Sequence, residues 1–282
     1  MVTRRKTLQL ACVCVALSAT PLALRVARAA DSPVSTVDTL ARNVERAEAI
    51  RAVKNLQYAY SQYAQFGRWA DLGALFTEDG QAIYGNDEIK GRAAITQYHT
   101  STFGGGKAGL PPGVLNSHFV DVPLVNLSAD GNSAKARWYG FSMLGGGATA
   151  RWDSGTFQNE YVKDDGVWKI SRLHYYPQFG GLVEKGWEAY SNPLPRVPYH
   201  FKSEDESGTP IPPPVGPAPK TTATLGSLEQ RIDTLNAEDQ ARNLQNAYGY
   251  YIDRKMWDDV IDLFTPDGVN RSMTSSHILR SK

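Results

Sequence analysis

One histidine in the chain stands where it could act as a base. His118 lies in the segment SHFVDV, whose alternation predicts a strand with His118 on the same face as Val120 and Val122. Imidazole titrates near neutrality, so in a dry pocket it could take a proton from a carbon beside a carbonyl, or assist a departing hydroxyl. The alternative is a core histidine hydrogen-bonded to the backbone. His118 is our first candidate catalytic residue.

Two tyrosines could supply the complementary electrophilic group. Tyr84 closes the short predicted strand QAIYG, and a phenolic hydroxyl directed at a developing enolate can serve as an oxyanion donor. Tyr60 lies on the inward stripe of the first predicted helix and recurs as Tyr248. The alternatives are an ordinary strand tyrosine for Tyr84 and an ordinary core aromatic for Tyr60.

The sequence does not contain the motifs expected for several other kinds of site. Both cysteines, Cys12 and Cys14, lie near the N-terminus, so no thiol nucleophile or thiolate metal site is expected downstream. The five histidines have no ligand-like spacing, and we expect no metal site. FGGGKAG and LGGGATA lack the order of a phosphate-binding loop, and there is no Gly-x-Ser-x-Gly elbow.

The periodicity of apolar residues changes once along the chain. Residues 37–66 keep helical spacing, Gly67 breaks it, and a short helix follows. KGRAAITQYHTSTFGG predicts another helix. The period then becomes two in SHFVDVPLVNL, SAKARWYGFSML, GTFQNEYV and VWKISRLHYY. Helices followed by a meander predict an α+β fold in which a curved antiparallel sheet wraps over the helices.

The chain contains an internal repeat. Residues 55–80 and 243–268 align without gaps, 188 positions apart, and 13 of the 26 positions are identical. A period this long indicates two domains rather than a solenoid. No predicted strands follow the second copy, whose apolar face would be partly exposed. Either the chain is a truncated or frame-shifted two-domain protein, which we favour, or the partial copy packs against the first domain or a second subunit.

These patterns divide the chain into five segments. Residues 1–29 form an export signal, with a basic start, an apolar stretch and ARA before the cut. A complete domain spans 37–180, and an extension with a Pro-rich linker spans 181–227. A partial second copy, helices only, spans 228–268, and a tail spans 269–282.

The export signal determines the expected location and charge of the mature protein. Both a twin-arginine signal and a general secretion signal fit the N-terminus, so we expect a periplasmic or secreted protein. Removal of residues 1–29 leaves 25 basic and 29 acidic residues, a net charge of −4. A mildly acidic protein without a basic stripe is not expected to bind nucleic acid, and no later segment is long and apolar enough to cross a membrane.

The order of short motifs resembles a known family. Tyr60, Trp69, the sequence LFTEDG, then KGRAAI, SHFVDV and DDGVWKISRL together resemble the SnoaL-like part of the nuclear transport factor 2-like superfamily. Scytalone dehydratase and bile-acid dehydratase are the most similar members in pattern. The resemblance implies a cone-shaped sheet (a cystatin-like α+β barrel) closed by helices around a deep apolar pocket. It implies cofactor-free proton abstraction from hydrophobic ring compounds, with His118 and Tyr84 at the family's histidine and phenol positions.

One position departs from the family pattern. Dehydratase-like members carry Asp four residues before the tryptophan, whereas this chain has Gln65 before Trp69. A carboxamide can hydrogen-bond to His118 but cannot hold the negative charge that stabilises an imidazolium. The resemblance also implies substrate contacts at Thr156 and Gln158, whereas His174 is expected at the pocket mouth because it is in register with Trp168 and Ile170 on the last strand. We expect these residues to bind substrate: Tyr60, Gln65, Trp69, Thr156, Gln158 and His174.

Two functions therefore remain open. The first is a cofactor-free lyase or isomerase of the dehydratase type that acts on a small hydrophobic cyclic compound, with His118 as base and Tyr84 as electrophile. The second is a non-catalytic module that binds a small ligand or forms a homodimer, which Gln65 favours.

Overall fold

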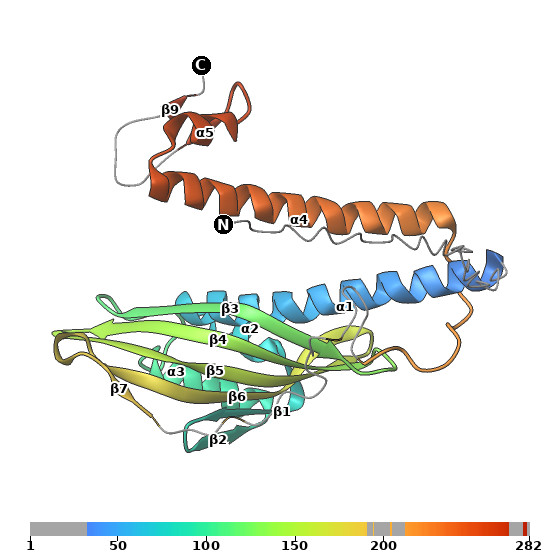
Figure 1. Cartoon of the computed structure of the whole chain (residues 1–282). Coiled ribbons are helices and arrows are strands. Elements are labelled where there is room, and N and C mark those ends of the chain that lie inside the picture. The colour runs from blue at the N-terminus through green and yellow to red at the C-terminus, as the bar shows by residue number, and fades with distance from the viewer. Residues whose placement is uncertain (1–32, 191–193, 195–203, 205–211, 271–278, 281–282) are drawn as a thin grey trace, which may run out of the picture.

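A curved mixed sheet and three helices form the main body of the chain (Figure 1). The computed structural model describes residues 33–190, 194, 204, 212–270 and 279–280. The predicted export signal, residues 1–29, lies outside the described residues. Within them, no helix combines the length and the apolar character needed to cross a membrane.

The helices follow the predicted pattern. α1 spans Pro33–Gln65, α2 spans Trp69–Ala74 and α3 spans Arg92–Thr102. Gly67 separates α1 from α2 with a positive φ of 67°, and a Cβ added there would lie 2.4 Å from the carbonyl carbon of Gly109. Only glycine fits this turn, so the predicted break at Gly67 is confirmed together with its physical reason.

The sheet has the strand order β2-β1-β6-β5-β4-β3. Its strands are β1 (Phe76–Tyr84), β2 (Asp87–Lys90), β3 (Leu115–Leu127), β4 (Ser133–Gly146), β5 (Thr149–Asp164) and β6 (Val167–Leu182). The short helix η1 (Val183–Lys185) follows β6, and β7 (Glu188–Ala189) then pairs with β6. Strands β3 to β6 form the predicted antiparallel meander, but β1 pairs with β6 in parallel. The sheet is mixed because α3 carries the chain from β2 to the opposite edge.

A bulge in β6 changes which side chains face the helices. Trp168 and Ile170 are buried, and the β5–β6 pairing then shifts register between Glu160 and Tyr161 of β5. After the shift, Leu173 is the next buried residue of β6. A shift of one residue turns every later side chain of a strand to the other face.

The core lies between the concave face of the sheet and helices α1 to α3 (Figure 1). Its largest fully buried side chains come from both the helices and the sheet, and they include Trp69, Leu72, Phe76, Ile95, Trp138, Tyr161, Ile170 and Leu173. This core holds the helices against the sheet and so fixes the positions of the side chains described below.

The second copy forms two helices, α4 (Leu225–Arg254) and α5 (Trp257–Asp262), followed by two two-residue strands, β8 (Val269–Asn270) and β9 (Leu279–Arg280). Figure 1 shows α4 lying along α1.

Apolar and charged contacts join α4 to α1. Leu228 is fully buried against Ala41 and Val44. Arg231 donates to both carboxylate oxygens of Glu48, at 2.7 and 2.5 Å, and Arg51 pairs with Glu238 and Asp239 at 2.9 and 3.0 Å. Since the partners advance together along both helices, α1 and α4 run parallel.

Candidate active site

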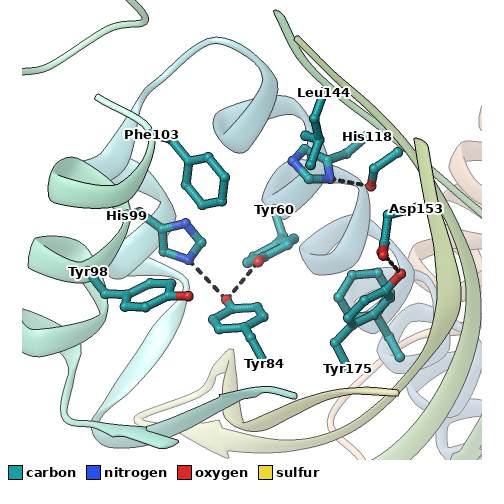
Figure 2. Close-up of a pocket in the computed structure, with 11 residues that line it drawn as sticks. Tyr60, Tyr84, Tyr98, His99, Phe103, His118, Leu144, Asp153 and Tyr175 are labelled. Carbon is teal, nitrogen blue, oxygen red and sulfur yellow. Dashed lines mark hydrogen bonds between the residues drawn. The ribbon is translucent and has the colours of Figure 1, made fainter. Parts of the chain in front are cut away.

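A cavity of about 170 Å³ opens between the concave face of the sheet and helices α1 and α3 (Figure 2). Phe103, Leu144 and Phe157 supply much of its apolar lining. Its polar lining comes from Tyr60, Tyr84, Tyr98, His99, His118, Ser142, Asp153 and Tyr175. The cavity is small beside the roughly 300–1,000 Å³ of pockets for drug-sized ligands, so its size suits a small ring compound.

His118 forms one wall, and its neighbours fix its tautomer. Asn116 donates from its amide nitrogen to the carbonyl oxygen of Ala64 at 2.9 Å, so its amide oxygen must face His118 Nε2, which lies 2.9 Å away. Nε2 therefore carries the hydrogen. Nδ1 keeps the lone pair and accepts from the hydroxyl of Ser142 at 2.8 Å.

Burial keeps the His118 ring neutral. Desolvation lowers the pKa of His118 from 6.5 to about 4, because the charged form loses its hydration in the cavity wall. At pH 7 the ring is therefore a neutral imidazole with a lone pair on Nδ1. Such a group can accept a proton in the cavity.

Three hydrogen-bonding groups form a chain on the facing wall (Figure 2). The Tyr84 hydroxyl lies 2.7 Å from the hydroxyl of Tyr60 and 2.9 Å from Nε2 of His99. Nδ1 of His99 is buried without a hydrogen-bond partner, and an unpaired acceptor is tolerated better than an unpaired N–H. We therefore assign the hydrogen of His99 to Nε2, which donates to Tyr84.

This assignment leaves one hydrogen for a substrate. Nε2–H of His99 and the two hydroxyls of Tyr60 and Tyr84 contribute three hydrogens, and two hydrogen bonds join the three groups. Burial, the largest cause, raises the pKa of both phenols, so both stay protonated at neutral pH. One phenolic hydrogen can thus be directed at an oxygen atom in the cavity.

Aromatic packing holds His99 in place. Its ring stacks on Trp69 with centroids 5.9 Å apart and on Phe103 at 5.8 Å. Desolvation, with a smaller contribution from His118, lowers the pKa of His99 to about 3. His99 is therefore neutral, and Trp69, predicted to contact substrate, instead supports the residue behind Tyr84.

A carboxyl group lies on the same side of the cavity as His118. Asp153 on β5 accepts a short hydrogen bond from the hydroxyl of Tyr175 on β6 (Figure 2). Burial raises the pKa of Asp153 above its usual value, and the hydrogen bond from Tyr175 partly opposes that rise. Asp153 lies directly opposite Ser142 in the β4–β5 pairing, and Ser142 lies opposite His118 in the β3–β4 pairing.

The structure brings only part of the predicted site together. His118, Tyr84 and Tyr60 all line the cavity, as predicted. Gln65, near the end of α1, is half-buried but does not line it. The adjacent residue Ala64 reaches the site through its carbonyl oxygen, which orients Asn116.

Three other predicted substrate contacts lie on the opposite face of the sheet. Thr156 and Gln158 alternate with the cavity residue Phe157, so they point away from the cavity; Gln158 accepts instead from Arg137. The sequence placed His174 in phase with Trp168 and Ile170, but the bulge in β6 turns it outwards. It lies opposite Gln158 in the β5–β6 pairing and stacks on Tyr176.

Several residues that line or support the cavity were not predicted as site residues, among them His99, Asn116, Ser142 and Asp153. His99 follows Ile95 by four positions on the inward stripe of its helix, and Asn116 precedes His118 by two positions on one strand face. These spacings could have indicated both residues. Ser142 and Asp153 depend on strand register, which the sequence does not show.

No metal site is evident in the described part of the chain. There, no group of three or more His, Cys, Asp or Glu side chains is arranged to hold a metal ion.

Solved structures are similar to this chain at low sequence identity. A putative scytalone dehydratase from Novosphingobium aromaticivorans is 22% identical, with 57% of this chain and 99% of that chain covered and a TM-score of 0.43. ActVI-ORFA from Streptomyces coelicolor is 20% identical over 45% of this chain and 95% of that chain, with a TM-score of 0.37. The LinA-type3 hexachlorocyclohexane dehydrochlorinase from Novosphingobium barchaimii is 15% identical over 56% and 99%, with a TM-score of 0.42.

A comparison with curated proteins gave no match. A family model matches residues 45–174 and again residues 233–277, which together make up more than half of the chain. The two matched segments include the two copies of the internal repeat. The chain belongs to the family of proteins with a SnoaL-like domain.

Proposed function

We propose that the protein is a cofactor-free lyase or isomerase that removes a proton beside the carbonyl group of a small hydrophobic cyclic compound. The observation that carries this proposal is the pairing of a neutral imidazole and a phenolic donor across one apolar cavity. Membership of the SnoaL-like family is compatible with this proposal, but the fold hosts many functions, so the residues of the site have to carry the assignment.

Each wall of the cavity has its own part in the reaction. The substrate carbonyl oxygen accepts the free phenolic hydrogen of the Tyr60–Tyr84 pair, which stabilises the enolate as it forms. Nδ1 of His118 takes the proton from the adjacent carbon. Rotation of the Ser142 side chain about χ1 releases the lone pair that Ser142 occupies in the free protein.

The surroundings of the site select the substrate. Phe103, Leu144 and Phe157 exclude water and favour an apolar ring. A dry cavity also strengthens the hydrogen bond to the enolate oxygen. A neutral cyclic ketone or β-hydroxyketone combines these requirements.

Hydrogen–deuterium exchange at carbon tests the proposal directly. The protein is incubated with cyclohexanone or 2-tetralone in D₂O, and loss of the α-proton signal is followed by NMR. We expect exchange above the buffer rate, and the variant His118→Gln should lower it about 10²-fold or more. His174→Gln, on the opposite face of the sheet, is the matched control and should retain the rate.

Two results would contradict the enzyme. Exchange that is equal in the wild-type protein and His118→Gln would remove His118 as the base. Binding of the ketones without any exchange would support the alternative, a non-catalytic ligand-binding module.

We also propose that the protein is exported. The basic and apolar residues 1–29 support a signal peptide with a cut before Ala30. Mass spectrometry of the protein from a periplasmic or culture fraction should find Ala30 at the N-terminus. An N-terminus at Met1 in every fraction would contradict export.

A further inference from the structure

The site contains a carboxyl group that proton abstraction does not use. On the first helix, Gln65, at the position where the family resemblance led us to expect a carboxyl group, lies outside the cavity. Asp153 enters the same cavity from β5 instead, on the side of His118 (Figure 2).

Three side chains form a row across adjacent strands. His118 on β3 is paired with Ser142 on β4, and Ser142 is paired with Asp153 on β5. Residues directly opposite each other on neighbouring strands share a face and lie about 4.5–5.5 Å apart at Cβ. Ser142 already bonds to Nδ1 of His118 at 2.8 Å, and its side chain lines the same cavity as the carboxyl group of its strand neighbour Asp153.

We propose that Asp153 protonates the hydroxyl group that leaves the substrate, and that Ser142 returns a proton from His118 to Asp153. This inference rests on the function proposed above. It specifies the reaction as the dehydration of a β-hydroxyketone and gives the site a carboxyl group from the sheet rather than from α1.

The proton balance of this cycle closes. The α-carbon–hydrogen bond breaks, its proton bonds to Nδ1 of His118, and its electron pair forms the enolate. The enolate then forms the carbon–carbon double bond while the β-carbon–oxygen bond breaks, and the departing oxygen takes the proton of Asp153 to become water. Ser142 gives its hydroxyl proton to the Asp153 carboxylate and takes the proton from His118, which restores the starting state.

The environment of Asp153 suits a proton donor. Burial raises the pKa of Asp153 above its usual value, which increases the protonated fraction available to a leaving group. Tyr175 hydrogen-bonds to Asp153, His118 lies beyond Ser142 in the same row, and Arg151 acts on Asp153 from the same strand. The hydrogen bond from Tyr175 also fixes the orientation of the carboxyl group.

Three probes separate the steps. Exchange of cyclohexanone in D₂O reports proton abstraction alone. Conversion of 3-hydroxycyclohexanone to 2-cyclohexenone requires a protonated leaving group, whereas 3-acetoxycyclohexanone releases acetate, which leaves without an acid. The variant is Asp153→Asn, and Glu160→Gln on the same strand is the control, since Glu160 points away from the cavity towards Lys135.

We expect Asp153→Asn to lower loss of hydroxide about 10²-fold or more. Exchange and loss of acetate should fall less than about tenfold, and Glu160→Gln should change none of the three rates. The inference is overturned if all three reactions fall equally, or if loss of hydroxide is retained. A wild-type protein that exchanges no α-proton would instead contradict the proposed function itself.

Discussion

The two copies of the repeat share a backbone but not a packing environment. Arg68 N–H donates to the carbonyl of Tyr63 at 2.8 Å, and the equivalent Met256 N–H donates to Tyr251 at 2.9 Å. The turn residues Gly67 and Lys255 both adopt left-handed conformations, with φ of 67° and 57°. Sequence that is half identical therefore gives the same helix–turn–helix twice.

Burial separates the two copies. Trp69 is 2% exposed beneath the sheet, whereas the equivalent Trp257 is 54% exposed. The sheet covers α2 and the inward stripe of α1, whereas among the described residues of the chain the one buried residue of α4 is Leu228, where α4 meets α1. The comparison shows that local sequence sets helix and turn, whereas tertiary partners decide whether the same apolar face forms a core and a cavity.

Replacing the paired tryptophans should give the largest contrast. Trp69→Ala removes a fully packed side chain and is expected to lower the free energy of unfolding by about 3–5 kcal/mol. Trp257→Ala should change it by about 0.5 kcal/mol or less, because most of that side chain is already in water. Urea denaturation followed by circular dichroism measures both values. Equal losses would mean that Trp257 is buried in solution.

Acid should affect the first copy's domain in particular. His99 and His118 lie in that domain, and helices α4 and α5 contain no histidine. Their folded pKa values of about 3 and about 4 lie below the unfolded value near 6.5, so the unfolded chain binds more protons in between. Stability is fully present above pH 6.5 and falls below it by about 1.4 kcal/mol per pH unit for each histidine.

Denaturation curves between pH 7 and 4.5 measure this slope. The variant His99→Gln should remove about half of it, whatever its effect on stability at pH 7. A slope that is unchanged in His99→Gln would show that His99 is not buried in its neutral form.

The contact between the copies should contribute less. Leu228→Ala deletes a side chain that is fully buried against Ala41 and Val44, and we expect a loss of about 2 kcal/mol from the docking of α4 on α1. Amide hydrogen exchange should accelerate in α4 but not in β3 to β6. The matched variant Leu244→Ala, on an exposed part of α4, should leave exchange unchanged. Faster exchange in the sheet would instead show that α4 supports the first domain.

Much of the fold, but less of the site, was predictable from the sequence. Periodicity located α1, the break at Gly67, α3 and the antiparallel meander, because these features depend on local patterns. The parallel pairing of β1 with β6 joins distant segments and leaves no local signal. The site contains residues of both kinds. His118, Tyr84 and Tyr60 were predicted from their types and their local sequence positions. Asp153 and Ser142 reach the cavity through the register of the strands, which the sequence does not show.

His174 shows how one extra residue in a strand makes a prediction from strand alternation wrong. Counting by twos from Trp168 and Ile170 directs His174 into the cavity. The bulge in β6 reverses the parity and places the ring on the opposite face. A bulge is a property of the paired strands, so the sequence of β6 alone could not reveal it.

The turn between the helices should show the smallest difference between the copies. Lys255 adopts a left-handed conformation that costs a non-glycine residue about 1 kcal/mol, so Lys255→Gly should stabilise α4–α5 by about 0.5–1 kcal/mol. The reverse type of change, Gly67→Ala, should destabilise the first domain by more than this, because the added Cβ meets the backbone of Gly109 at 2.4 Å. Hydrogen exchange of the α4 amides and denaturation of the first domain measure the two effects. Two neutral changes would contradict both expectations. The left-handed conformation would then cost no free energy in either copy, and the close contact with Gly109 would not explain the glycine at position 67.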